Sequence, residues 1–79
     1  MEARVKLIWD FRGANAMPIA QHHATHLAEY AEAQNLQNPL VGDEAVTPMH
    51  HIAFMVVERE MTDKLRETLK PHRGQLYED

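Results

Sequence analysis

Residues 50–57 form the most apolar stretch of the chain and constrain its fold more than any other segment. In an extended strand, successive side chains point to opposite faces. One face would carry Ile52, Phe54 and Val56, and the other Ala53, Met55 and Val57. Strands that are apolar on both faces are usually central and have a packed layer on each side. The fold must therefore supply cover for both faces of this strand.

The residues before this strand predict a first strand, a long helix and an edge strand. Apolar and charged residues alternate over residues 4–11, which predicts a half-buried strand. Asn15 is placed to cap a helix that extends to about residue 34 and has an Ala-rich face. Residues 35–42 contain Asn-Pro and Gly and predict a loop. Residues 43–47 then predict a short edge strand, which Pro48 would interrupt.

The residues after it predict a second helix and one more short strand. Apolar residues recur at helical spacing over residues 58–69, and Pro71 ends that helix. Residues 75–77 could add a strand. The order is therefore β-α-β-β-α in a single α+β domain, residues 1–79. We expect both helices on one face of a sheet of three strands, or of four if residues 75–77 pair.

The second face of the sheet then needs cover that two helices cannot provide in so short a chain. We expect a second copy of the chain to provide it, because exposed apolar patches usually mark interfaces. The sequence thus predicts a homodimer through the sheet face bearing Ala53, Met55 and Val57, together with Ile8. The alternative is a tail or a loop of the same chain folded over that face.

Composition argues against several classes of function. The chain has no cysteine, which excludes disulfides, cysteine-based zinc sites and a thiol nucleophile and is compatible with a reducing compartment. Its net charge of −4 argues against nonspecific nucleic-acid binding, which needs several cations on one surface. No apolar run has the length of a membrane span. We therefore expect a cytoplasmic protein with neither a membrane nor a nucleic-acid partner.

Histidine is the residue type that carries the most chemistry here. Five of the six histidines lie within residues 13–58, a stretch without Lys or Arg. His22 and His26 are four residues apart on the first helix, a spacing that suits two ligands of one metal ion. His50 and His51 point to opposite faces of their strand, so one of them could add a third ligand. These four residues predict a site for zinc, nickel or copper; the alternative is that they are solvated or hydrogen-bonded histidines.

His23 differs because it lies in the middle of the apolar face of the first helix. A core-facing imidazole needs a hydrogen-bond partner for at least one ring nitrogen, such as a backbone carbonyl or Asp10. If His23 is buried in its neutral form, folding weakens as the pH falls through the pKa of the unfolded state. We therefore expect His23 and Asp10 to be structural or pH-sensitive residues.

Two segments are candidates for binding an anion. Arg12, Gly13 and Asn15 lie between the first strand and the first helix, where backbone N–H groups can hold a phosphate or a carboxylate. No complete Gly-x-Gly-x-x-Gly or P-loop pattern accompanies them. Lys70 and Arg73 lie at the end of the second helix, where cations are explained by their favourable interaction with the helix dipole.

The sequence does not determine a function, because no complete catalytic constellation is present. We favour a small dimeric, non-enzymatic binding or regulatory module. One alternative is a histidine-based protein that binds a divalent transition metal. Another is a small enzyme in which His23 or a strand histidine acts as general base at the dimer interface, in a pocket that also holds Asp10.

Overall fold

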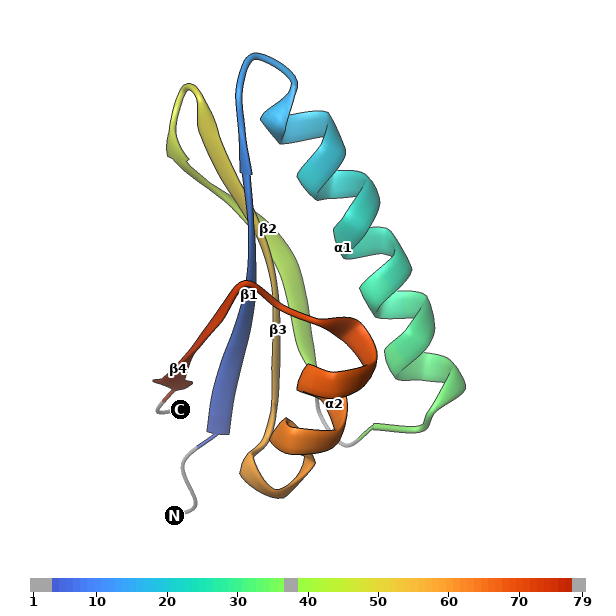
Figure 1. The fold of residues 1–79 in the computed structure, drawn as a ribbon. Helices are drawn as coiled ribbons and strands as arrows, with labels where there is room; N and C mark the ends of the chain where they lie inside the picture. The colour runs from blue at the N-terminus through green and yellow to red at the C-terminus, as the bar shows by residue number, and fades with distance from the viewer. Residues whose placement is uncertain (1–3, 37–38, 78–79) are drawn as a thin grey trace.

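The apolar segment is strand β3 (His50–Glu58), and it lies in the interior of an antiparallel sheet, as expected. The computed structural model describes residues 4–36 and 39–77. The elements before β3 are β1 (Arg4–Arg12), α1 (Ala16–Ala33) and β2 (Leu40–Thr47). Those after it are the 3₁₀ turn η1 (Arg59–Met61), α2 (Thr62–Leu69) and β4 (Arg73–Tyr77). The α+β fold predicted from the sequence is confirmed (Figure 1).

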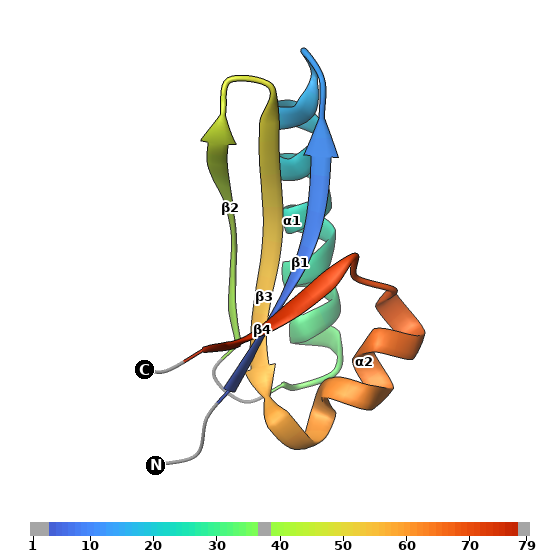
Figure 2. The same ribbon diagram turned by 60° about the vertical axis from the view of Figure 1, so that its left-hand side comes forward.

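The sheet has the strand order β2-β3-β1-β4, and every neighbouring pair is antiparallel (Figure 2). The strands β1 and β2, which α1 connects, have β3 between them. The strands β3 and β4, which α2 connects, have β1 between them. This is the split β-α-β arrangement. β2 begins at Leu40, earlier than expected, because it pairs with β3 from Leu40↔Val56 onward despite Gly42. The second helix begins as η1, and β4 starts at Arg73 rather than at residue 75.

Both helices pack on the same face of the sheet (Figure 1). This helix-covered face holds the main hydrophobic cluster, which joins apolar side chains of β1 and β3 to α1 and to Leu65 of α2. Ala53, Met55 and Val57 belong to this cluster and are at most 2% exposed. The predicted dimer surface is therefore wrong, because the chain's own helices cover it. The register explains why: Trp9↔Ala53 and Leu7↔Met55 place the apolar residues of β1 on that same face.

The opposite face of the sheet, termed the open face below, carries no helix, yet its central apolar residues are buried. Ile8, Ile52 and Val56 lie on it and are at most 4% exposed within the single chain. The pairing Ile8↔Phe54 places Ile8 here, and not with Met55 as expected from the sequence. Lys6 extends over this face with its Nζ 4.5 Å from the centre of the Phe54 ring. Long charged side chains cover apolar neighbours with their stems, so the sheet no longer needs a second copy for burial.

Helix α1 is amphipathic and uses small residues for its contact with the sheet. Its buried positions are Ala16, Ala20, Ala24, Leu27 and Ala31. Asn15 occupies the N-cap position, as expected, but its side chain makes no capping hydrogen bond. Within residues 4–36 and 39–77, no helix combines the length and the apolar character that crossing a bilayer requires.

Candidate functional site

Asp10 of β1 is the centre of a polar cluster on the open face. One of its carboxylate oxygens, Oδ1, lies 2.7 Å from Nε2 of His50 and 3.1 Å from a terminal nitrogen of Arg73. The other, Oδ2, accepts a hydrogen bond from Nε of Arg73 at 3.0 Å. A bidentate arginine–carboxylate pair of this kind is among the stronger polar contacts in proteins. Asp10, Arg12, His50 and Arg73, together with His72 at the edge of β1, are termed the Asp10 cluster below. The His72 ring lies toward the helix-covered face, with its centre 6.3 Å from that of Phe11.

His50 links Asp10 to Arg12. A carboxylate can only accept, so Nε2 of His50 donates to Asp10. A guanidinium can only donate, so Nδ1 of His50 accepts from Arg12, at 3.5 Å. The chain of contacts from Arg73 through Asp10 and His50 thus ends at the Arg12 guanidinium.

The end of α2 brings His72 and Arg73 to β1. Lys70 adopts the left-handed conformation that terminates α2, and Pro71 follows it. The indole Nε1 of Trp9 donates to the carbonyl of Leu69 at 3.1 Å, which fixes this helix end against β1. The backbone N–H of His72 then donates to the carbonyl of Ile8 at 2.9 Å. The backbone N–H of Asp10 donates to Nδ1 of His72 at 2.8 Å. The imidazole thus takes the place of a backbone carbonyl of a neighbouring strand beside β1.

The electrostatics of the cluster keep Asp10 ionised. The hydrogen bonds from Arg73, reinforced by His50 and by the positive charge of Arg73, lower the pKa of Asp10 to about 2, although partial burial acts in the opposite direction. The carboxylate in turn raises the pKa of the Arg73 guanidinium. The side chain of Asp10 is 15% exposed and that of His50 is 12% exposed, so the centre of the cluster is protected while its rim is not.

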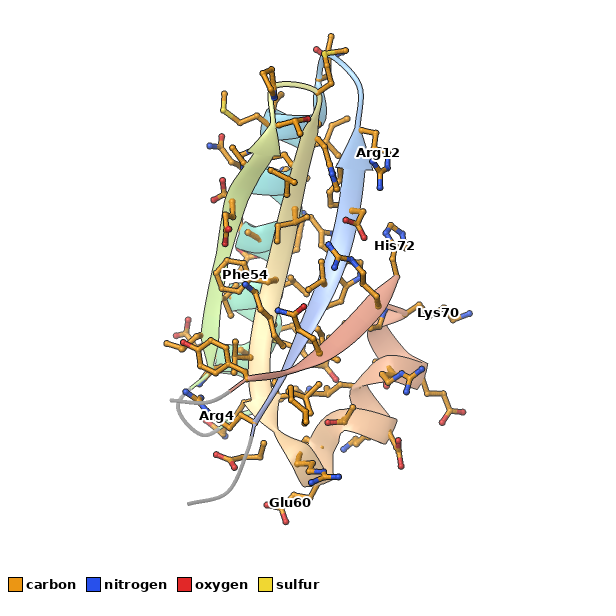
Figure 3. The ribbon with its side chains drawn as sticks, turned by 90° about the vertical axis from the view of Figure 1, so that its left-hand side faces the viewer. Arg4, Arg12, Phe54, Glu60, Lys70 and His72 are labelled. Carbon is orange, nitrogen blue, oxygen red and sulfur yellow. The ribbon has the colours of Figure 1, made fainter. Side chains whose placement is uncertain are left out.

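Arg12 is the exposed cation at the rim of the cluster (Figure 3). Among the described residues, its guanidinium contacts only Nδ1 of His50, and no carboxylate lies at ion-pair distance. Gly13, which follows it, has a φ of 112°, a conformation that favours glycine. Its N–H donates to the carbonyl of Met49 at 2.8 Å. Arg12 therefore presents unused donors, whereas the backbone N–H of Gly13 is already engaged.

The open face carries four of the eight Lys and Arg side chains, but this does not make it broadly basic. Lys6 forms an ion pair with Glu44 at 3.7 Å, and Arg73 pairs with Asp10. Arg4 lies with its guanidinium carbon 5.7 Å from the centre of the Tyr77 ring. Arg12 is thus a cation of this face for which the described residues supply no carboxylate at ion-pair distance.

The four histidines expected to share a metal lie at three separate places. His22 and His26 lie together on the exposed side of α1, with their Nε2 atoms 3.0 Å apart. His50 belongs to the Asp10 cluster on the open face, whereas His51 points to the helix-covered face, where its Nε2 lies 2.7 Å from Oδ2 of Asp43. Within the described part of the chain, no group of three or more His, Asp or Glu residues could hold a metal ion.

His23 packs among aromatic rings on the helix-covered face. Its ring centre lies 5.0 Å from that of Trp9 and 5.5 Å from that of Phe11. Its Nε2 is buried and has no hydrogen-bond partner among the described residues. Burial, and to a lesser extent the neighbouring histidines, lower the pKa of His23. Asp10 lies on the other face of the sheet, so the two residues expected to act together are separated.

The sequence alone does not connect His72 and Arg73 to Asp10, although both contact it in the structure. The signal for them was present, because residues 70–74 concentrate cations just after a helix. Their role depends on contacts across more than 60 residues of chain, which composition and spacing do not reveal.

Comparisons of the chain with protein-family models, with characterised proteins and with solved structures gave no match.

Proposed function

We propose that this protein is a non-enzymatic binding module whose Asp10 cluster holds an anionic group, a phosphate or a carboxylate, on the open face of the sheet. The observation that carries the proposal is Arg12. It is exposed, it has no carboxylate partner among the described residues, and it contacts a histidine that is itself held by Asp10. An arginine in this state supports binding because its planar fork of N–H donors fits the oxygens of carboxylates and phosphates.

The rest of the cluster supports binding by restricting Arg12. Arginine loses side-chain entropy when it is immobilised, which weakens the gain from an ion pair on a free surface. Here, His50 contributes an acceptor to Arg12, and Asp10 and Arg73 hold His50 in place. Asp10 itself is neutralised by Arg73, so its charge opposes an incoming anion less than an unpaired carboxylate would.

The same contacts favour binding over catalysis. A general base needs a ring nitrogen that can reach a substrate proton. Both ring nitrogens of His50 are engaged, by Asp10 and by Arg12. The hollow formed by Ala28, Leu36 and Pro39 lies near the end of α1, away from the cluster. A small enzyme remains the alternative, and it would require Arg12 to leave His50 when a substrate binds.

The experiment is a titration of the ¹⁵N-labelled protein with inorganic phosphate and, separately, with succinate at low ionic strength. We expect the amide signals of residues 10–13, 50 and 72–73 to shift together and to saturate. Arg12→Gln should abolish this response. Arg12→Lys should weaken it, because lysine keeps the charge but lacks the planar set of N–H donors of arginine. Added salt should reduce the affinity, since the contact is exposed.

Arg66→Gln is the matched control, because Arg66 is exposed on α2 and the substitution removes the same charge. It should leave the response of residues 10–13 unchanged. Equal weakening by Arg66→Gln and Arg12→Gln would mean that only the overall charge matters. Shifts centred on α2 in the unmodified protein would contradict the proposed site directly.

The homodimer stays a prediction. The face first expected to form it is covered by α1 and α2, so a second copy would have to contact another surface. Light scattering after size-exclusion chromatography measures the mass in solution, and a monomer at high concentration would contradict the homodimer. Binding of an anion by Arg12 requires no second copy, so either result leaves that proposal open to its own test.

A further inference from the structure

Two histidines on the exposed side of α1 are arranged as a chelating pair. The Nε2 atoms of His22 and His26 lie 3.0 Å apart in a hydrogen bond, in which one nitrogen donates and the other accepts. When a metal ion displaces that proton, both nitrogens offer a lone pair at this spacing. Their rings meet edge to face, with centres 4.5 Å apart and planes inclined at 82°. Both side chains are exposed, so a solvated ion can reach both nitrogens without any opening of the fold.

The spacing of the two nitrogens fits the ligand shell of a transition metal. A metal ion about 2.1 Å from each nitrogen would see them at an angle of roughly 90° when they are 3.0 Å apart. That is the angle between neighbouring ligands in square-planar and octahedral shells, which Cu²⁺ and Ni²⁺ prefer. A tetrahedral zinc shell would need the nitrogens roughly 3.4 Å apart.

Glu29 lies close enough to His26 to support it as a metal ligand. Its Oε1 lies 3.4 Å from Nδ1 of His26. A carboxylate at the distal nitrogen orients the imidazole and directs the lone pair of Nε2 toward a metal. Glu29 therefore acts behind the ligand and not as a third ligand, in agreement with the absence of any three-residue metal group in the described chain.

The surroundings of the pair favour a cation. Residues 14–57 contain neither Lys nor Arg, so no permanent positive charge lies on α1. The strand histidines do not compete for the ion, because Asp10 and Asp43 already engage His50 and His51. The chelating pair is thus the one place in the described residues where two histidine nitrogens face each other.

We infer that His22 and His26 bind one divalent transition metal ion, of the Cu²⁺ or Ni²⁺ kind, with Glu29 as the positioning residue of His26. Two protein ligands leave the remaining coordination positions for water or for a ligand carried by another molecule. This site lies on α1, apart from the Asp10 cluster, so the inference does not depend on the proposed anion binding.

The test is a calorimetric titration of tag-free protein with Cu²⁺ and with Ni²⁺ at pH 7.5. We expect one ion per chain. His22→Gln and His26→Gln should each weaken the affinity by more than tenfold, and Glu29→Gln by about tenfold, the usual cost of losing such a support. Broadening of amide signals by Cu²⁺ should be centred on residues 21–29.

The decisive control keeps the number of histidines and separates the pair. His26→Gln combined with Ala28→His retains six histidines, but places the second imidazole on another side of α1. Ala28 is exposed, and circular dichroism of the double variant should show an unchanged helix content. The double variant should bind as weakly as His26→Gln alone. Unchanged affinity in either variant, or broadening centred on residues 50 or 72, would overturn the inference.

Discussion

Asp10→Asn tests whether the Asp10 cluster stabilises the fold through the charge of its carboxylate. Asparagine keeps the shape of the side chain but removes the charge that Arg73 and His50 share. The folded protein lowers the pKa of Asp10 from 3.8 to about 2, and Arg73 is the largest cause. A carboxyl group with a lowered pKa stabilises the folded state above its unfolded pKa, and this stabilisation disappears as the pH falls through the folded pKa.

The magnitude follows from the size of the shift. A change from 3.8 to about 2 corresponds to about 2 kcal/mol in the free energy of unfolding. The side chain of Arg73 is 49% exposed, so solvent screening reduces the value to about 1 kcal/mol. We therefore expect the stability difference between the wild type and Asp10→Asn to be constant at neutral pH. It should narrow by about 1 kcal/mol between pH 5 and pH 2.

Urea unfolding at intervals between pH 7 and pH 2 measures this difference. Glu67→Gln is the control, because Glu67 is an exposed residue of α2 and the substitution removes the same charge. Its difference from the wild type should change little over the same range. If the Asp10→Asn and wild-type curves stay parallel down to pH 2, the carboxylate does not stabilise the folded state through its charge, and the reasoning fails.

Two further substitutions test the helix-covered face. His23→Leu should stabilise the protein by about 1 kcal/mol in urea unfolding at pH 7.5, because it removes a buried Nε2 without a partner while keeping contact with Trp9. Leu65→Ala should destabilise it by about 2–5 kcal/mol in the same assay, since Leu65 is 1% exposed and joins α2 to the core. The exposed Thr68→Ala is its control and should change the stability by less than about 0.5 kcal/mol. Destabilisation by His23→Leu, or equal effects of Leu65→Ala and Thr68→Ala, would contradict these assignments.

The elements of this fold were predictable where their signal is local. Alternation over residues 4–11 and the helical spacing after Asn15 each lie within one segment, and β1 and α1 appear at those positions. β2 begins three residues earlier than its pattern indicates, because pairing with β3 draws Leu40 and Gly42 into the sheet. The residues of β2 alone do not reveal this pairing, because the stabilising hydrogen bonds come from β3.

The covered face of β3 could not be chosen from the sequence because both of its faces are apolar. The choice depends on the register with β1, and a shift by one residue would exchange the faces. The observed register places the small Ala53 opposite the large Trp9. This match of volumes leaves room for α1 on the same face, but many other registers are compatible with the sequence alone.

The candidate sites divide in the same way. His22 and His26 were predictable as a pair, since four residues of helix bring them together. The Asp10 cluster was not, because its contacts span 40 residues to His50 and 63 to Arg73. Asp10 was expected beside His23 as well, yet the two lie on opposite faces. Arg12 was a candidate through its junction with α1, and the structure instead connects it to His50.

The open face shows how a short chain can bury both sides of a central strand. Ile8 and Val56 are at most 2% exposed, although no helix covers them. Lys6 and Phe54 lie over this face in a cation–π contact, and the Asp10–Arg73 pair lies further along it. A second copy packed here would have to desolvate these charges, which costs several kcal/mol for each ion whose pairing is lost. The charged side chains that help to bury Ile8 and Val56 within one chain thus also disfavour self-association through this face of the sheet.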